Sequence, residues 1–163
     1  METLVRALRQ DYPDFSYEEG AIARWSPTTK TIFYVVSSDI SAQWALLHEL
    51  GHALLEHQSY NSDANLLFKE VDAWDKAGSI SAYYGLQIPE SYIQDCLDTY
   101  RDWLAKRSTC PTCHTIGLQR SQHLYNCLSC PTKWNVSHNN LCRPYRLKKT
   151  EKAKSLDSIE PGF

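Results

Sequence analysis

The chain begins with segments whose apolar spacing changes from helical to strand-like. Residues 1–10 place apolar side chains three and four positions apart, in a stretch that ends near Pro13. Residues 21–25 and 31–36 are rich in β-branched and aromatic residues, and the polar residues 26–30 between them have turn chemistry. The pattern therefore predicts a short amphipathic helix followed by a β-hairpin.

Three longer stretches have the apolar period of helices. The first follows candidate N-cap residues at 37–41 and runs to about His57. The second covers 64–78 and is expected to stop at Gly78, and the third covers about 90–107. Helices combined with a short antiparallel sheet predict an α+β fold that is mostly helical.

The C-terminal third differs from the rest in charge and cysteine content. Residues 1–109 contain 9 Lys/Arg and 16 Asp/Glu, whereas residues 110–163 contain 8 and 3, within a net charge of −2. Five of the six cysteines also follow residue 109. We therefore expect a first domain over 1–108, a cysteine module over 109–143 and a basic tail without regular structure over 144–163.

Composition and hydropathy narrow the class of protein. With 163 residues and 42% hydrophobic residues, the chain has the composition of a globular protein. No apolar run reaches the ~18–20 residues that cross a bilayer. The N-terminus lacks a basic segment followed by an apolar one, so we expect no signal peptide, no membrane association and a cytoplasmic location.

The first long helix contains the motif H-E-x-x-H. His48 and His52 are four residues apart and share one helix face, so their imidazoles can bind one metal ion. Glu49 lies beside them, where it can accept a proton from an attacking water, and Gly51 allows another backbone to come close. The alternative is a buried helix whose histidines only find hydrogen-bond partners, but that is costly in so apolar a stretch.

A catalytic zinc usually has a third protein ligand. The longer motif H-E-x-x-H-x-x-G-x-x-H is excluded by Leu55 and Gln58, and His57 falls about 140° around the helix from His52. We therefore expect His57 at the surface or behind a ligand. Glu70 is the better third ligand, because it lies on the apolar stripe of the next helix; the alternative is an ion pair with a buried Lys or Arg.

These residues resemble the ImmA/IrrE family of gluzincin-type metallopeptidases. The run from His48 to His57, HELGHALLEH, followed by Glu70-Val71-Asp72-Ala73, is similar to the family's H-E-L-G-H and its downstream E-x-E-A-N-x-F-A helix. The resemblance covers about residues 17–80. Asp72, Trp74 and Lys76-Ala77 depart from the second motif, on the side that concerns substrate.

The resemblance implies His48, His52 and Glu70 as ligands of a catalytic zinc and Glu49 as the general base. It also implies a protein or peptide substrate, such as a regulatory protein, that lies extended along the hairpin of residues 21–36. An oxyanion donor is expected as well, with Tyr60, Tyr83 and Tyr84 as candidates.

The cysteine module has the spacing of a zinc ribbon. Two C-x-x-C pairs, Cys110 with Cys113 and Cys127 with Cys130, are separated by 13 residues and can supply four thiolates to one structural zinc. A rival set is Cys127, Cys130, His138 and Cys142. With few aliphatic residues, the module is expected to need metal to fold.

Two other functions remain open. SprT-like proteases, which are DNA-associated, also join H-E-x-x-H to a zinc ribbon, but they take a third His downstream, and none occurs between His57 and His114. A non-catalytic nucleic-acid-binding regulator would use the ribbon and the basic tail, although such a protein would not need Glu49. The tail's basic residues are Arg143, Arg146, Lys148, Lys149, Lys152 and Lys154.

Overall fold

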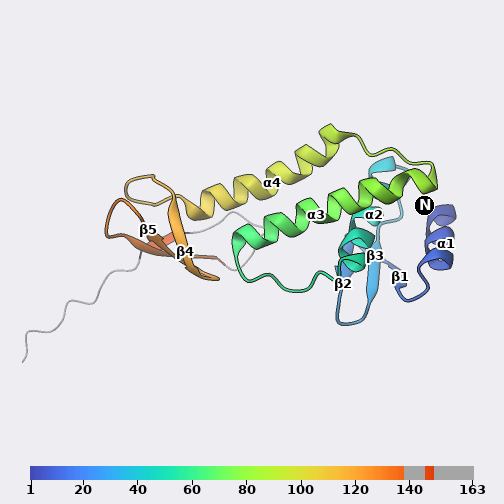
Figure 1. Cartoon of the computed structure of the whole chain (residues 1–163), viewed down its shortest axis with the longest axis horizontal. Helices are drawn as coiled ribbons and strands as arrows, with labels where there is room; N and C mark the ends of the chain where they lie inside the picture. Colours follow the sequence, from blue (N-terminus) through green and yellow to red (C-terminus); the bar gives the residue numbers. More distant parts are fainter. Residues whose placement is uncertain (138–145, 149–163) are drawn as a thin grey trace, which may run out of the picture. The chain divides into compact units, whose positions relative to one another are not determined.

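A computed structural model describes residues 1–137 and 146–148, and it has an α+β fold (Figure 1). The chain forms two compact units, Met1–Leu104 and Ala105–Phe163, and each is described by itself. No helix in the described ranges is long and apolar enough to cross a membrane.

The first unit contains most of the helices. Its elements are α1 (Glu2–Asp11), β1 (Ser16–Glu19), β2 (Arg24–Ser26), β3 (Thr31–Tyr34), α2 (Ile40–Leu54), α3 (Asp63–Ser81), η1 (Ala82–Tyr84) and most of α4 (Glu90–Ser108). The predicted helices and hairpin are therefore confirmed in kind and in approximate position.

The predicted stop at Gly78 is wrong. Helix α3 continues to Ser81 because Ala77 and Ile80 extend its buried stripe past the exposed glycine. A glycine inside a helix costs only about 1 kcal/mol, which this burial offsets. The chain reverses instead at Gly85, whose φ of 66° is the left-handed conformation that glycine adopts freely.

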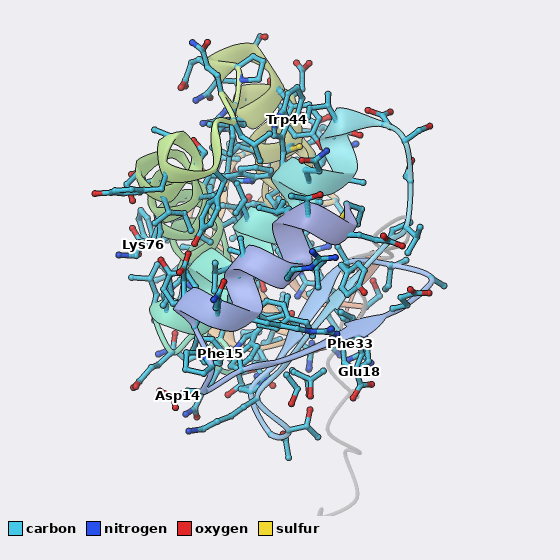
Figure 2. All side chains as sticks on the ribbon, turned by 90° about the vertical axis from the view of Figure 1, so that its right-hand side faces the viewer. Asp14, Phe15, Glu18, Phe33, Trp44 and Lys76 are labelled. Atoms are coloured by element: carbon cyan, nitrogen blue, oxygen red, sulfur yellow. The ribbon has the colours of Figure 1, made fainter. Side chains whose placement is uncertain are left out.

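The sheet of the first unit has the order β1-β3-β2. Strands β2 and β3 form the predicted antiparallel hairpin, with Trp25 opposite Ile32. Strand β1 pairs with β3 in parallel and was not predicted, because only Tyr17 of its four residues is buried. Glu18 of β1 and Phe33 of β3 are paired on this sheet (Figure 2).

Helix α2 packs between the sheet and α3 (Figure 1). Its buried residues Leu46, Leu47 and Leu50 join side chains of α1, β3 and α3 in one apolar core. On its α3 side, a Cβ built on Gly51 would lie 2.5 Å from the carbonyl oxygen of Ala73. The two helices are therefore as close as their backbones allow.

The second unit contains a four-stranded antiparallel sheet and the end of α4. The strands are β4 (Gly117–Ser121), β5 (Leu124–Cys127), β6 (Lys133–Val136) and β7 (Arg146–Lys148), in that order. Strand β7 lies in the segment for which the sequence predicted no regular structure. The sequence did not predict it because three residues, Arg-Leu-Lys, are too few to establish an alternation of polar and apolar positions.

A small aromatic core holds this sheet together. Tyr125 stacks on Trp134 with ring centroids 5.5 Å apart, beside the buried Cys110 and Val136. The indole N–H of Trp134 donates to the carbonyl of Arg107, at 2.9 Å, which anchors the end of α4 to the sheet. This core has only four buried residues among those that the structure describes, so it contributes little apolar burial.

Candidate metal centres

The first candidate centre is formed by His48 and His52 of α2 and Glu70 of α3. The Nε2 atoms of the two histidines are 3.1 Å apart. Glu70 Oε2 lies 3.2 Å from Nε2 of His48 and 3.6 Å from Nε2 of His52. His48 and Glu70 are buried, at 7% and 6% exposure. The three donor atoms therefore converge between α2 and α3 rather than in open solvent.

These separations fit a metal ion. Donors about 2.0–2.2 Å from a tetrahedral ion lie roughly 3.3–3.6 Å from one another, close to the three distances observed. A single proton can bridge only one pair of the three atoms at a time, whereas a cation among them contacts all three. The group can therefore hold a metal ion, and it is one of two such groups in the described part of the chain.

Glu70 is ionised in this arrangement. Burial raises its pKa, but the hydrogen bond with His48 and the nearby imidazole of His52 outweigh burial and hold the pKa at about 2. Glu70 meets the two histidines rather than a buried Lys or Arg, the alternative partner that the sequence left open. A carboxylate that is ionised and buried beside two imidazoles is a donor ready for a cation.

The ring of His48 is held by stacking. Trp74, one turn after Glu70 on α3, lies against it with ring centroids 4.2 Å apart and an interplanar angle of 28°. Nδ1 of His48 is buried and has no hydrogen-bond partner among the described residues. Trp74 stands where the resemblance predicted an asparagine, so at this departure an aromatic contact orients a ligand candidate.

Glu49 lies beside the histidines, as the motif predicted, and is fixed by the edge strand. Its Oε2 accepts a hydrogen bond of 2.7 Å from the main-chain N–H of Trp25 in β2. Burial raises the pKa of Glu49, and the nearby His48 and His52 act in the opposite direction. Trp25 was not singled out from the sequence, because a main-chain donor leaves no signal in residue type.

His57 is not on the helix face that the angular argument assumed, because α2 ends at Leu54. Nδ1 of His57 lies 2.8 Å from Nδ1 of His52, the ring nitrogen that faces away from the other donor atoms. His57 is therefore behind a ligand candidate, which is one of the two positions expected for it. The indole N–H of Trp25 donates to the His57 carbonyl at 2.9 Å. Burial is the largest cause that lowers the pKa of His57.

A tyrosine outside the predicted set reaches the centre. Tyr100 of α4 lies near Glu70, and burial together with this carboxylate raises the pKa of Tyr100. Among the tyrosines expected as oxyanion donors, Tyr84 donates to Asp11 at 2.8 Å and Tyr83 is 87% exposed. The sequence placed Tyr100 on the apolar side of its helix but gave no sign that its hydroxyl lies near Glu70.

A pocket of about 350 Å³ adjoins the edge strand. Phe15, Trp25 and Leu54 contribute apolar walls, and Asp14 and Glu56 contribute charged ones. Asp14 and Phe15 come from the segment between α1 and β1 (Figure 2). The same Trp25 that holds Glu49 therefore also lines a space large enough for a side chain.

The second candidate centre is the four-cysteine group of the second unit. The Sγ atoms of Cys110 and Cys130 are 3.7 Å apart, and those of Cys113 and Cys127 are 3.4 Å apart. Four sulfurs about 2.3 Å from a tetrahedral ion would be separated by roughly 3.8 Å. All four lie within 4.8 Å of one another and can hold a metal ion, in an arrangement compatible with a zinc ribbon.

Main-chain and hydroxyl groups lower the pKa of two of the four thiols, Cys110 and Cys127. The N–H groups of Thr112 and Ser129 point at Sγ of Cys110 and Cys127. A hydrogen bond with the Thr115 hydroxyl is the largest cause that lowers the pKa of Cys127 to about 6. Burial and hydrogen bonds with Cys113 and Cys127 act in the opposite direction on Cys130, whose pKa is raised. Cys127 is therefore a member of the group that readily forms the thiolate, the form that binds metal.

Two of the four members of the rival set, His138 and Cys142, lie outside the described residues. So do most of the basic residues of the tail that were considered for nucleic-acid contacts, although Arg146 and Lys148 fall on β7.

Comparison with known proteins identifies no relative: no family model, no curated protein and no solved structure matches the chain.

Proposed function

We propose that this chain is a zinc-dependent metallopeptidase that hydrolyses a peptide bond in a specific protein, and that it is related to the ImmA/IrrE family. The observation that carries the proposal is the convergence of His48, His52 and Glu70 with Glu49 fixed beside them. A metal brace alone would not need a buried carboxylate next to the ligands. A hydrolase needs one as a general base.

The residues divide the chemistry between them. Zinc, when bound by His48, His52 and Glu70, would activate a water and polarise the scissile carbonyl. Because the Trp25 N–H occupies Oε2 of Glu49, the carboxylate is oriented and Oε1 remains to accept the proton of the attacking water. Glu49 then delivers that proton to the leaving nitrogen. The raised pKa of Glu49 brings it closer to neutral pH, which favours both transfers.

The open edge of β2 is where an extended substrate would lie. Trp25 and Ile32 form a pair in which the Trp25 N–H bonds to Glu49 rather than to β3, so the main chain of Trp25 points to the open edge. The edge is short, and Pro27 after it offers no N–H. A peptide could thus form few ladder bonds there, and the adjoining pocket would supply the rest of the binding.

The four-cysteine unit is proposed to bind a second, structural zinc. Four thiolates close a tetrahedral site with no position left for substrate. Because the aromatic core around Tyr125 and Trp134 is small, metal binding would supply much of this unit's folding energy.

Zinc stoichiometry by native mass spectrometry tests both sites. We expect two zinc ions per chain, one after Glu70→Ala and one after Cys110→Ser. A single zinc that survives Glu70→Ala and disappears in Cys110→Ser would remove the enzyme proposal and leave only the ribbon.

Hydrolysis is tested on a proteome-derived peptide library, with new termini read by mass spectrometry. Glu49→Gln should retain zinc and lose cleavage, because its side chain cannot accept the proton. Glu19→Gln, a matched change at an exposed position of β1, should behave as the wild type. Cleavage that persists in Glu49→Gln would show that the proposed mechanism is wrong.

A further inference from the structure

The contact between His52 and His57 fixes more than the position of a ring. We propose that His57 is a positioning residue that holds His52 in the Nδ1–H tautomer, so that His52 presents an unprotonated Nε2 to the metal. The inference rests on the metal site of the proposed function, but it concerns a property that exists before metal binds.

The proton assignment follows from the two nitrogen pairs. Nε2 of His52 faces Nε2 of His48 at 3.1 Å and Oε2 of Glu70 at 3.6 Å, on the side where the donors converge. To bind a cation there, Nε2 must carry a lone pair, and the proton of the neutral ring must sit on Nδ1. Nδ1 of His57 lies 2.8 Å from Nδ1 of His52, so in this tautomer the Nδ1–H of His52 donates a hydrogen bond to Nδ1 of His57.

The local backbone places His57 where it can do this. After α2 ends, Glu56 adopts a left-handed conformation with φ of 52°, which turns the chain back on the helix. The main-chain N–H of His57 then donates to the carbonyl of His52 at 2.9 Å. Main chain and side chain of His57 therefore both contact His52. A left-handed conformation costs energy in a residue other than glycine, so the surrounding contacts must hold it.

The segment that carries His57 is fixed from two sides. From the sheet, the indole N–H of Trp25 donates to the His57 carbonyl at 2.9 Å. From α3, the ammonium group of Lys69 donates to the carbonyls of Gln58 and Ser59, at 3.2 and 3.0 Å. An acceptor held this firmly can select one tautomer of its partner without losing the hydrogen bond to local motion.

The two histidines of the motif are therefore oriented by different means. His48 has stacking on Trp74 and a buried Nδ1 without a described partner. His52 has a hydrogen bond at its distal nitrogen, the arrangement that in metal sites fixes the tautomer and raises ligand basicity. Removing His57 should consequently affect His52 and leave the orientation of His48 unchanged.

Three variants separate this role from a general effect on packing. His57→Phe keeps a ring and removes the acceptor, whereas His57→Asn keeps an acceptor oxygen near the position of Nδ1. Asn61→Phe places the same aromatic ring at an exposed position of the same segment and serves as the control. Thermal unfolding of each metal-free protein establishes that it is folded.

The first readout is the tautomer of His52 in the metal-free protein, from long-range ¹H–¹⁵N NMR correlations at pH 8. We expect the Nδ1–H form in the wild type, Asn61→Phe and His57→Asn, and a shift toward the Nε2–H form in His57→Phe. A wild-type protein with His52 in the Nε2–H form would overturn the inference, whether or not the chain binds zinc or cleaves peptides.

The second readout is zinc affinity of the His48–His52–Glu70 site, from competition with a chelator. Loss of such a partner typically weakens metal binding by about 10–100-fold, and we expect that loss in His57→Phe with most of it recovered in His57→Asn. Equal affinities in the wild type and His57→Phe would overturn the inference. Absence of zinc from this site in the wild type would instead remove the proposed function, and the NMR result would still stand alone.

Discussion

The closest approach of α2 and α3 predicts a defined cost for one added methyl group. In Gly51→Ala, the new Cβ would lie 2.5 Å from the carbonyl oxygen of Ala73 and 3.2 Å from its carbonyl carbon. Real Cβ atoms essentially never come within 3.0 Å of such an atom, and contacts are ordinary only beyond 3.4 Å. The atoms that the new Cβ would meet belong to the main chain of Ala73, so no side-chain rotation can relieve the contact. The two helices must therefore separate by about 0.5–0.9 Å.

The free energy of unfolding and the affinity for metal should both fall. Overpacking of this kind costs about 1–3 kcal/mol, and each kcal/mol lowers Tm by about 4–8 °C in a unit of this size. Glu70 lies one turn before Ala73, so the same separation moves its carboxylate away from His48 and His52. Metal sites tolerate shifts of only about 0.2 Å in donor distances, so metal binding should weaken by more than the loss of stability explains.

The same helix pair offers a matched control. A Cβ built on Gly78 of α3 meets nothing within 4 Å, so Gly78→Ala should stabilise the helix by roughly 0.5–1 kcal/mol. Thermal unfolding of the metal-free proteins and a zinc titration of each would measure both effects. If Gly51→Ala matches the wild type in Tm and zinc affinity, the contact between α2 and α3 is looser than the structure shows and the reasoning fails.

Three further outcomes follow from the described contacts. Tyr100→Phe removes a hydroxyl that lies near Glu70, so zinc affinity in a chelator competition should fall several-fold. The free energy of unfolding should fall by about 1 kcal/mol, the effect typical of losing one polar contact. The pKa of Glu70 lies at about 2 in the folded chain, whereas that of an ordinary Glu carboxyl, as in the unfolded chain, is 4.5. The stabilising effect of ionised Glu70 on the metal-free protein is therefore present above pH 4.5 and is lost as the pH falls toward 2. Glu70→Gln should remove this part of the acid dependence of Tm. A Cβ at Gly117 would overlap the ring of Trp134, so Gly117→Ala should broaden the NMR signals of the second unit even with zinc present. An unchanged spectrum would contradict the packing described for the core of this unit.

The sequence predicted the elements whose evidence lies within one short segment. Helical spacing placed His48 and His52 on one face, and the apolar stripe of α3 placed Glu70 inward, where the structure has it 6% exposed. The hairpin was predictable because its strands and turn are contiguous. Each of these follows from residue order alone, through the geometry of a single helix or hairpin.

What could not be predicted depends on contacts between distant segments. Strand β1 is mostly polar, and its order depends on its parallel pairing with β3 and on contacts of Tyr17 with α1. Tyr100 reaches Glu70 because α4 returns to α3, thirty residues further along the chain. His57 lies behind a ligand candidate as one of the two expectations had it, but not for the reason of helical angle, because α2 ends three residues earlier. The turn at Glu56 depends on the contacts of Trp25 and Lys69 rather than on a glycine.

These distant contacts give the edge strand a second role. The main-chain N–H of Trp25 holds Glu49, and its indole N–H holds the carbonyl of His57, which in turn contacts His52. A single residue of β2 therefore connects the proposed general base with the support of a proposed ligand. It also lines the pocket beside the open edge, so a peptide bound there would touch the residue that keeps both groups in place. In the proposed enzyme, substrate binding and the geometry of the metal site are consequently coupled through Trp25.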